Sequence, residues 1–407
     1  MRLIDRFFAR AIRRGELTVI QPDGTSRTYG APDAELAPVT IRLARGAAAA
    51  ILRNPGTGAG EAFMDGRLSV EHGDILGLLR IAKASNLWEQ GSPALHASRL
   101  GKMLAQLRFR RDRRRIARQS KTNVAHHYDL NDRLYDLFLD ADRQYSCAYF
   151  TDPAQSLDRA QADKKAHIAA KLALEPGMRV LDIGCGWGGM ALYLHAKTGA
   201  DVTGITLSEE QLKVARARAD AAGVADSVRF ELVDYRDVDG RFDRIVSVGM
   251  FEHVGTPNYA AFFAKCRSLL TTEGVMLLHT IGRAGGPGST DAFTAKYIFP
   301  GGYIPALSEI ARGYEGSRMF CTDIEVLRLH YALTLEQWYA RTVAARDSIV
   351  ALYDERFFRM WTFYLAGSSV AFRYGGLVNY QLQFARDRHA LPITRDYIGA
   401  AEARLRG

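Results

Sequence analysis

From residue 178 onward, short apolar runs rich in β-branched residues alternate with amphipathic stretches of helical spacing. This alternation predicts βαβ units, and hence a doubly wound, mostly parallel sheet of the α/β class. We expect strands at residues 179–183, 201–206, 228–233, 242–248 and 275–280. Helices are expected between them at residues 189–197, 209–222 and 258–269.

The N-terminal part of the chain has a different pattern. Apolar residues between Leu3 and Ile12 recur at helical spacing with arginines between them, which predicts an amphipathic basic helix. That helix could pack on the protein's own core or lie in a lipid headgroup layer. Turn residues then separate short β-prone runs at 17–20 and 39–43, so we expect a small α+β domain at the front of the chain.

These patterns divide the chain into three parts. We predict a small domain at residues 1–85, a basic helical connector at 86–120 and a larger, enzyme-sized domain at 121–407. Within the last part, residues 282–321 contain glycine and proline clusters that break the strand-helix rhythm, so they are interpreted as a lid insertion.

Composition limits the class of protein. With 407 residues, 47% hydrophobic and 24% charged, the chain is typical of an ordinary globular protein of two or three domains. The longest uncharged apolar run, residues 360–372, is shorter than the roughly 20 residues that cross a bilayer. The four cysteines are too widely spaced for CxxC pairs, so we predict no metal site and a reducing cytoplasm.

The positive charge is concentrated in the first third of the chain. Residues 1–120 hold 21 Lys/Arg against 11 Asp/Glu (+10), and the remainder holds 33 against 34 (−1). The segment Arg108–Arg118 alone contains seven arginines and one aspartate. An anionic partner would be attracted there, and the absence of helix-turn-helix, zinc or RNP patterns favours membrane phospholipid over nucleic acid. A solvated connector helix is the alternative.

A glycine-rich sequence, LDIGCGWGG, follows the first predicted strand. Glycines at this edge of a doubly wound sheet let the backbone turn tightly and approach a ligand. Gly184, Gly186 and Gly189 also satisfy the spacing of a dinucleotide loop. The second strand ends in Thr206-Leu207-Ser208 without a carboxylate to hold a ribose, which disfavours NAD.

Several motifs together identify a family. VLDIGCGWGG resembles the first motif of class I S-adenosylmethionine-dependent methyltransferases. With its neighbours, the chain from about residue 120 to 390 resembles the cyclopropane-fatty-acyl-phospholipid synthases and mycolic acid methyltransferases; these neighbours are YSCAYF, VTGITLSEEQ, FDRIVSVGMFEHVG, LLHTIG, KYIFPGGYIP and LHYALTL. In the small domain, GEAFMDGRLSVEHGDILGLLRIA resembles part of sterol-carrier-like lipid-binding domains. The resemblance implies a Rossmann-like fold and S-adenosyl-L-methionine as cofactor.

The resemblance also implies the cofactor contacts. It places Gly184 and Gly186 against the methionine part, and Tyr145 and Ser146 near its carboxylate. Ribose and adenosine contacts fall on Thr206, Leu207 and Gln211. A Gln amide can serve where the strand-tip carboxylate is missing, because it both donates and accepts hydrogen bonds. Tyr235 is a candidate adenine wall, or an ordinary half-buried tyrosine at a strand end.

The implied chemistry adds a methylene across an alkene. The weakly nucleophilic double bond attacks the sulfonium methyl, and a base then removes a proton from the cation. The resemblance implies that this base is bicarbonate, held by the residues that match the family's pocket, namely Cys147, Glu252, His279, the backbone of Ile281, and Tyr331. Taken singly, His279 would be interpreted as a core histidine and Cys147 as a buried filler.

We therefore expect an enzyme that cyclopropanates unsaturated acyl chains of phospholipid at an anionic membrane surface. It would be cytoplasmic and peripherally associated with the inner face of the membrane. Alternatives are a methyl-branching or amine-directed methyltransferase of the same superfamily, or an inactive lipid-binding protein. The oligomeric state, a homodimer among the options, is left open.

Overall fold

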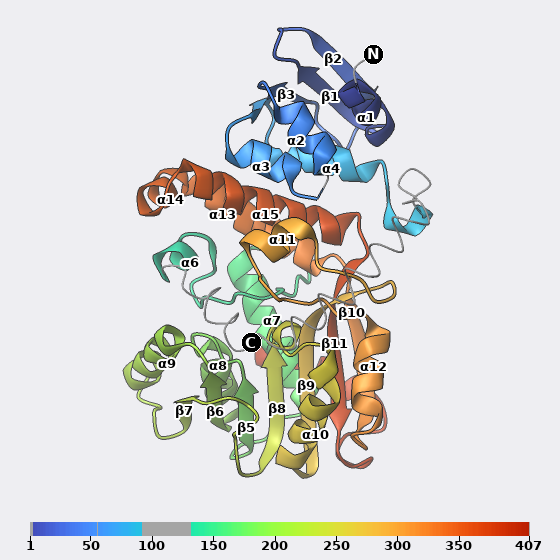
Figure 1. Cartoon of the computed structure of the whole chain (residues 1–407). Coiled ribbons are helices and arrows are strands. Elements are labelled where there is room, and N and C mark those ends of the chain that lie inside the picture. The colour runs from blue at the N-terminus through green and yellow to red at the C-terminus, as the bar shows by residue number, and fades with distance from the viewer. Residues whose placement is uncertain (1–2, 55, 92–131, 407) are drawn as a thin grey trace. The chain divides into compact units, whose positions relative to one another are not determined.

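The computed structural model describes residues 3–54, 56–91 and 132–406. In this part the chain forms two compact units. The first unit takes in residues up to 91 together with 290–300 and 332–376, and the second takes in 132–289, 301–331 and 377–406. Packing thus groups segments that are far apart in sequence (Figure 1). Most of the predicted connector 86–120, including the arginine run, lies outside the described residues, and the predicted domain boundaries stay predictions.

The first unit contains a four-stranded sheet in the order β2-β1-β3-β4. Strands β1 and β3 are parallel, and the other neighbours are antiparallel. The strands are β1 (Gly15–Ile20), β2 (Ser26–Ala31), β3 (Val39–Leu43) and β4 (Leu68–His72). Alternate residues of β1 and β3 are buried, which places one face of the sheet on a core.

Helices from three parts of the chain complete this unit. Phe363 on α15 lies near Phe63 on α3 and Phe293 on α11, with ring centroids 6.2 and 4.8 Å away. Glu336 on α13 pairs with Arg80 and Arg373 at 2.8 Å each. The helices are α1 (Leu3–Ala11), α2 (Ala47–Arg53), α3 (Gly58–Met64), α4 (Ile75–Ala84), η1 (Trp88–Gln90), α11 (Ala292–Tyr297), α13 (His330–Ala344), α14 (Arg346–Leu352) and α15 (Glu355–Arg373).

Helix α1 packs on the unit's own core on one side and leaves apolar residues exposed on the other, so it is compatible with both predicted roles of the N-terminal helix. Ile4, Phe8 and Ile12 are buried, so one side of the segment packs on the unit's own core. Leu3 and Phe7 are 72% and 38% exposed. The helix therefore keeps an apolar, solvent-facing side next to its exposed arginines.

The second unit is built on a seven-stranded sheet in the order β10-β11-β9-β8-β5-β6-β7. Strands β9, β8, β5, β6 and β7 are parallel, and β11 runs antiparallel to both of its neighbours. The strands are β5 (Arg179–Ile183), β6 (Asp201–Thr206), β7 (Val228–Leu232), β8 (Phe242–Val248), β9 (Leu270–Arg283), β10 (Phe320–Leu327) and β11 (Leu377–Ala385). This arrangement confirms the predicted α/β fold, and the strand order reverses at β5, where such sheets bind ligands.

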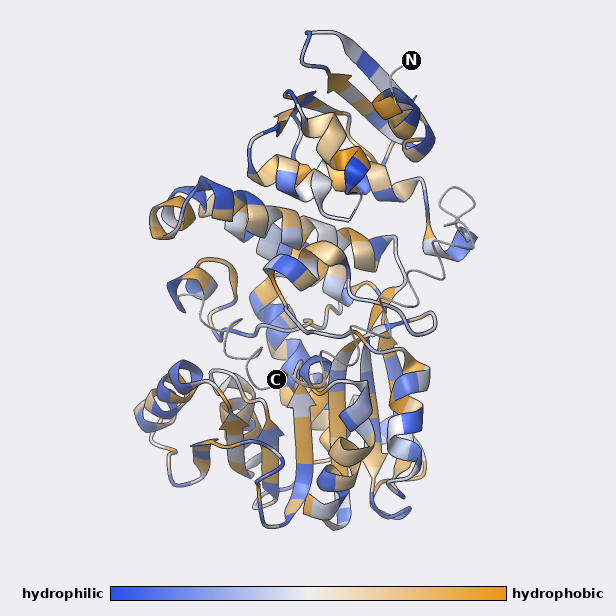
Figure 2. Ribbon diagram, viewed as in Figure 1, coloured by the Kyte–Doolittle hydropathy of each residue, from blue (hydrophilic) through white to orange (hydrophobic). Residues whose placement is uncertain are grey.

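Both faces of this sheet are covered by helices. Apolar side chains of β5, β8, β9 and β11 pack with α10 and α12 on one face, and those of β5, β6 and β7 pack with α7, α8 and α9 on the other. Figure 2 shows the hydrophobic residues gathered along the central strands. The helices are α6 (Asp132–Phe138), α7 (Leu157–Leu172), α8 (Gly189–Thr198), α9 (Glu209–Ala221), η2 (Phe251–His253), η3 (Thr256–Asn258), α10 (Tyr259–Leu269), α12 (Leu307–Glu315) and α16 (Asp396–Arg406).

Some predicted elements differ from the structure. The strand expected at 275–280 extends over Leu270–Arg283, and β10 and β11 were not predicted. The predicted lid at 282–321 is shared between the units, because residues 290–300 pack in the first while α12 packs on α10 in the second. In the described part of the chain, no helix combines the length and the apolar character that a membrane span requires.

Candidate active site

The glycine loop at the end of β5 forms as the sequence predicts. Gly184, Gly186 and Gly188 have φ of +83°, +55° and +83°, which disfavours any residue with a Cβ, and α8 begins at Gly189. A Cβ on Gly184 would lie 2.9 Å from the side chain of Met250, whereas one on Gly186 would meet no protein atom within 4 Å. The backbone at Gly186 therefore borders open space.

That space belongs to an open pocket of about 900 Å³, adjoining solvent included, at the carboxyl ends of the parallel strands. Of the eight residues predicted to bind the cofactor, six line it: Gly184, Gly186, Thr206, Leu207, Gln211 and Tyr235. Gln211 is buried, and its Oε1 accepts a hydrogen bond from Thr206 Oγ1 at 3.0 Å. This bond orients the Gln211 amide at the tip of β6, where the sequence has no carboxylate.

Beside the predicted Tyr235, the pocket is also lined by Asp234, Arg236 and His253, which the sequence analysis did not assign. Asp234 binds the guanidinium of Arg236, with Nε at 2.8 Å from Oδ1, and Tyr235 packs edge-on against Phe262. Burial lowers the pKa of His253, another lining residue, to about 4. The position of residues 234–236 just after β7 was the signal that could have identified them as pocket residues, because loops at strand ends face the crevice.

Tyr145 and Ser146 are not among the lining residues of this pocket. Ser146 Oγ accepts a hydrogen bond from Lys164 Nζ at 2.8 Å, and the same ammonium donates to Gln144 Oε1 at 2.7 Å. The Tyr145 ring packs against Tyr135, with centroids 5.4 Å apart. Burial lowers the pKa of Lys164 to about 8. The predicted contact of Tyr145 and Ser146 with the cofactor carboxylate stays a prediction.

A buried carboxylate precedes the glycine loop. Asp182 on β5 is 2% exposed, and its Oδ2 has no hydrogen-bond partner among the described residues. Burial raises the pKa of Asp182 to about 7, while the charge of Lys164 acts in the opposite direction. An unsatisfied buried acceptor fits a cationic ligand group, such as the amine of S-adenosylmethionine, better than it fits an anionic pyrophosphate.

Two of the five residues predicted to hold the base, Glu252 and Ile281, are joined by a hydrogen bond beside the strand ends, and His279 lies two residues before Ile281 on the same strand. Glu252 lies on η2, and its Oε1 accepts a hydrogen bond from the Ile281 N–H at 2.7 Å. Its Oε2 is buried and has no hydrogen-bond partner in the described part of the chain. Burial raises the pKa of the Glu252 carboxyl. This oxygen is free to accept a hydrogen bond from a bound hydroxyl group.

His279 is fully enclosed on β9. Its Nε2 lies 2.9 Å from Asn379 Nδ2, and its Nδ1 lies 3.2 Å from Gln381 Nε2, both on β11. Burial holds the pKa of His279 well below its usual range, so the ring is neutral. A neutral imidazole has one donor and one acceptor nitrogen, so one of these amides donates to the ring through its NH₂ group and the other must present its oxygen to the ring N–H. A bicarbonate bound here would compete with Asn379 and Gln381 for the ring, and with Glu252 for the Ile281 N–H.

The other two predicted residues lie on separate segments of the second unit. Cys147 is buried, with its Sγ 3.4 Å from the carbonyl oxygen of Ala148. Tyr331 is buried in the first turn of α13; the first two residues of this helix belong to the second unit, and its remainder from Ala332 belongs to the first. Their joint action with Glu252 and His279 stays a prediction.

Comparison with known proteins defines the family. The family model described as mycolic acid cyclopropane synthetase matches residues 115–382. The cyclopropane-fatty-acyl-phospholipid synthase of Escherichia coli (strain K12) is 39% identical over 338 residues, covering 83% of this chain and 85% of the relative. A probable fatty acid methyltransferase of Pseudomonas putida is 42% identical over 285 residues, covering 67% of this chain and 72% of the relative.

Solved structures agree with this assignment. The cyclopropane synthase MmaA2 from Mycobacterium tuberculosis has a TM-score of 0.62 at 33% identity, covering 65% of this chain and 98% of that chain. The mycolic acid cyclopropane synthase CmaA1, complexed with SAH and CTAB, has a TM-score of 0.61 at 34% identity, covering 65% and 98%. The family predicted from the motifs is confirmed: the chain belongs to the mycolic acid cyclopropane synthetase family of S-adenosylmethionine-dependent methyltransferases.

Proposed function

We propose that the protein transfers a methylene from S-adenosylmethionine to the double bond of an unsaturated acyl chain in membrane phospholipid, forming a cyclopropane. The observation that carries the proposal is the strand-end pocket, which is lined by six predicted cofactor residues, two of them glycines of the loop after β5. The similarity of 83% of the chain to a cyclopropane-fatty-acyl-phospholipid synthase supports the choice of substrate.

In this reaction the alkene gains one methyl group from S-adenosylmethionine and then loses one proton, so the net addition is CH₂. The alkene forms a bond to the methyl carbon as the carbon–sulfur bond breaks, and ring closure follows when the new methyl group loses a proton. A bound bicarbonate would supply the base for that proton. Glu252 would accept the hydrogen bond of the bicarbonate hydroxyl through Oε2, which has no hydrogen-bond partner in the described chain, and Ile281 holds that carboxylate in place through Oε1.

The product tests this proposal directly. Purified protein, S-adenosylmethionine, bicarbonate and vesicles of unsaturated phospholipid should give an acyl chain heavier by one CH₂, measured by mass spectrometry. The product should resist catalytic hydrogenation under conditions that saturate alkenes. A product of the same mass that takes up hydrogen would show instead that proton loss leaves an alkene.

Methyl branching is the second candidate, because the relative from Pseudomonas putida is named a probable fatty acid methyltransferase. Reductive branching adds CH₂ and two hydrogens, so it needs a hydride donor. The glycine loop of this chain is assigned to S-adenosylmethionine, and the sequence contains no second dinucleotide fingerprint. A product heavier by CH₂ and two hydrogens would favour this candidate, as would a requirement for a reduced cofactor.

We further propose that the protein acts at the inner face of the membrane, where helix α1 contributes to docking. Its exposed Leu3 and Phe7 lie on the helix beside the exposed Arg6 and Arg10. Apolar side chains beside basic ones are typical of helices that lie in a headgroup layer. An anionic surface attracts each such arginine by about 1 kcal/mol.

Vesicle co-sedimentation tests this docking. The double variant Arg6→Gln/Arg10→Gln should bind anionic vesicles about thirtyfold more weakly, from about 2 kcal/mol of lost attraction. The control is Arg53→Gln/Arg404→Gln, which removes the same charge from exposed positions outside α1. Equal losses in both variants would contradict a role for α1. Changing Arg111, Arg113, Arg114 and Arg115 to Gln tests the arginine run separately.

A further inference from the structure

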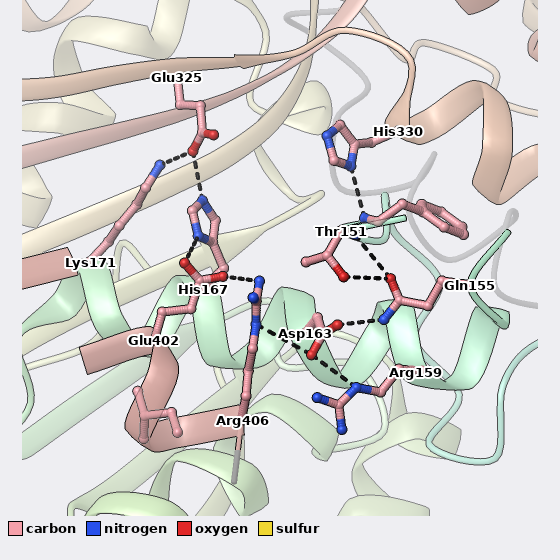
Figure 3. Close-up of polar contacts among 12 residues, drawn as sticks. Thr151, Gln155, Arg159, Asp163, His167, Lys171, Glu325, His330, Glu402 and Arg406 are labelled. Carbon is pink, nitrogen blue, oxygen red and sulfur yellow. Dashed lines mark hydrogen bonds and ion pairs between the residues drawn. The ribbon is translucent and has the colours of Figure 1, made fainter. Parts of the chain in front are cut away.

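Two predicted base-site residues lie on segments that the chain joins by an unusual hydrogen bond. Cys147 is in YSCAYF before α7, and Tyr331 is in LHYALTL at the start of α13. The backbone N–H of Phe150 donates to His330 Nδ1 at 2.9 Å, across 180 residues of sequence (Figure 3). His330 directly precedes Tyr331, and Phe150 lies three residues after Cys147. The bond therefore ties the two segments together next to both residues.

This bond requires one form of the histidine. Because a backbone N–H can only donate, His330 Nδ1 must carry the lone pair, and a neutral ring must carry its proton on Nε2. Burial lowers the pKa of His330, which favours the neutral ring. The nearby charges act on it in different directions, since Glu325 favours the charged form while His167 and Arg328 oppose it.

Each of the three residues from 149 to 151 has its own partner. The Tyr149 N–H donates to the carbonyl of Ala160 at 3.1 Å, and its ring is stacked between His330 and His167, with centroids 4.9 and 4.1 Å away. After Phe150, the Thr151 N–H donates to Gln155 Oε1 at 2.9 Å. The segment that follows Cys147 is thus fixed residue by residue.

The other side of the stack is anchored by charged groups from three elements. His167 on α7 lies 2.6 Å from Glu325 on β10 and 3.2 Å from Glu402 on α16 (Figure 3). Lys171 also binds Glu325, at 2.5 Å. Burial alone would lower the pKa of His167, but the hydrogen bonds to Glu325 and Glu402 raise it. Tyr149 therefore rests on a ring that is itself held in place.

We propose that His330 is a positioning residue for the deprotonation step, holding Tyr331 and the Cys147 segment in register through its bond to the Phe150 N–H. This inference rests on the proposed bicarbonate-assisted function. It assigns no contact between His330 and the substrate. Its consequence is that losing the Nδ1 acceptor should disturb the base while leaving the cofactor pocket intact.

Two substitutions separate the acceptor from the ring. His330→Phe keeps a ring beside Tyr149 but removes the acceptor, whereas His330→Asn keeps an acceptor oxygen near the place of Nδ1 and removes the ring. We expect His330→Phe to lower kcat by about tenfold to a hundredfold, as small misplacements in active sites do. It should also raise the bicarbonate concentration needed for half-maximal activity, with an unchanged KM for S-adenosylmethionine. His330→Asn should recover most of both losses.

The outcomes are distinguishable from a failure of the proposed function. Wild-type kcat and bicarbonate response in His330→Phe would overturn the positioning role, as would equal impairment of His330→Asn. A merely structural role would alter cofactor binding and bicarbonate response together, and that result would also overturn it. A wild-type protein that makes no cyclopropane overturns the proposed function before any variant is measured, and wild-type turnover that ignores bicarbonate overturns both proposals.

A measurement on the unmodified protein keeps the test independent of variant folding. Nitrogen NMR of the histidine rings in the full chain distinguishes the two neutral tautomers. We expect His330 to show a bare Nδ1 and a protonated Nε2. A proton on Nδ1 would overturn the proposal.

Discussion

The cofactor pocket and the base cluster of this protein are built in opposite ways. The pocket is lined by the glycine loop and by strand ends, with Leu207 46% exposed beside it. The base cluster, Glu252 and His279, consists of buried side chains that bond to their neighbours. Glu252 accepts a hydrogen bond from the Ile281 N–H, and His279 on β9 bonds to Asn379 on β11. A ligand held by strand-end loops leaves a local motif in the sequence, whereas a site assembled across strands depends on pairing that no single motif records. Four changes test this contrast.

The largest effect is expected in the base cluster. Glu252→Gln keeps the size of the side chain and can still accept the Ile281 N–H, but it removes the charge and one acceptor position. Turnover should fall by about 10² to 10⁴, the usual contribution of acid–base groups, while S-adenosylmethionine binds as before. Kinetics and calorimetric cofactor titration measure the two quantities. Equal losses of turnover and of cofactor affinity would show that the two regions are not separable. Wild-type turnover would contradict the proposed role of Glu252.

The next effect is expected in the cofactor pocket. A Cβ on Gly186 meets no protein atom within 4 Å and so occupies ligand space. Gly186→Ala should weaken cofactor binding about ten- to hundredfold, from 1–3 kcal/mol of overpacking. Gly223→Ala is the matched control, because Gly223 also has a positive φ, +67°, and open surroundings, but it lies outside the pocket. If both variants bind equally weakly, backbone strain rather than lost ligand space explains the result.

The contrast between a local motif and a site assembled across strands also explains which elements could be predicted from the sequence. The strands 179–183, 201–206 and 242–248 were predicted at their observed bounds, because buried parallel strands are continuous apolar runs bounded by turns. Strand β11 was missed: its sequence LVNYQLQFA alternates polar and apolar residues, yet Asn379, Gln381 and Gln383 are all buried. Their partners are His279, Lys171 and Tyr397, which only the folded sheet brings alongside. The residues that orient His279 were therefore not recognisable from the sequence.

A smaller effect is expected at the tip of β6. Gln211→Ala removes the amide that Thr206 orients, and should weaken cofactor binding about tenfold, the value of one hydrogen bond. Gln211→Glu restores an acceptor at the place where a carboxylate commonly holds a ribose, so it should bind within a few-fold of wild type. Turnover at saturating cofactor should be unchanged in both. A variant with normal affinity but low turnover would place Gln211 functionally with the base cluster instead.

The smallest effect is on stability against pH, and it also separates the two regions. The folded protein keeps His279 neutral, because burial holds its pKa far below the ordinary 6.5, whereas the unfolded chain protonates it. Its contribution to stability is complete above pH 6.5 and is lost as the pH falls toward the folded pKa. His167 acts the other way: its pKa is raised, so its contribution is complete below pH 6.5 and is lost as the pH rises through the folded value.

Comparing wild type with His279→Gln isolates the effect of His279, since His167 is present in both. We expect the variant to be less stable at pH 7.5 and to lose less stability than wild type between pH 7.5 and 5.5, measured by urea unfolding. Parallel pH curves would mean that His279 takes up a proton in the folded state as readily as in the unfolded chain, and a protonated ring could accept no hydrogen bond from the amide of Asn379 or Gln381.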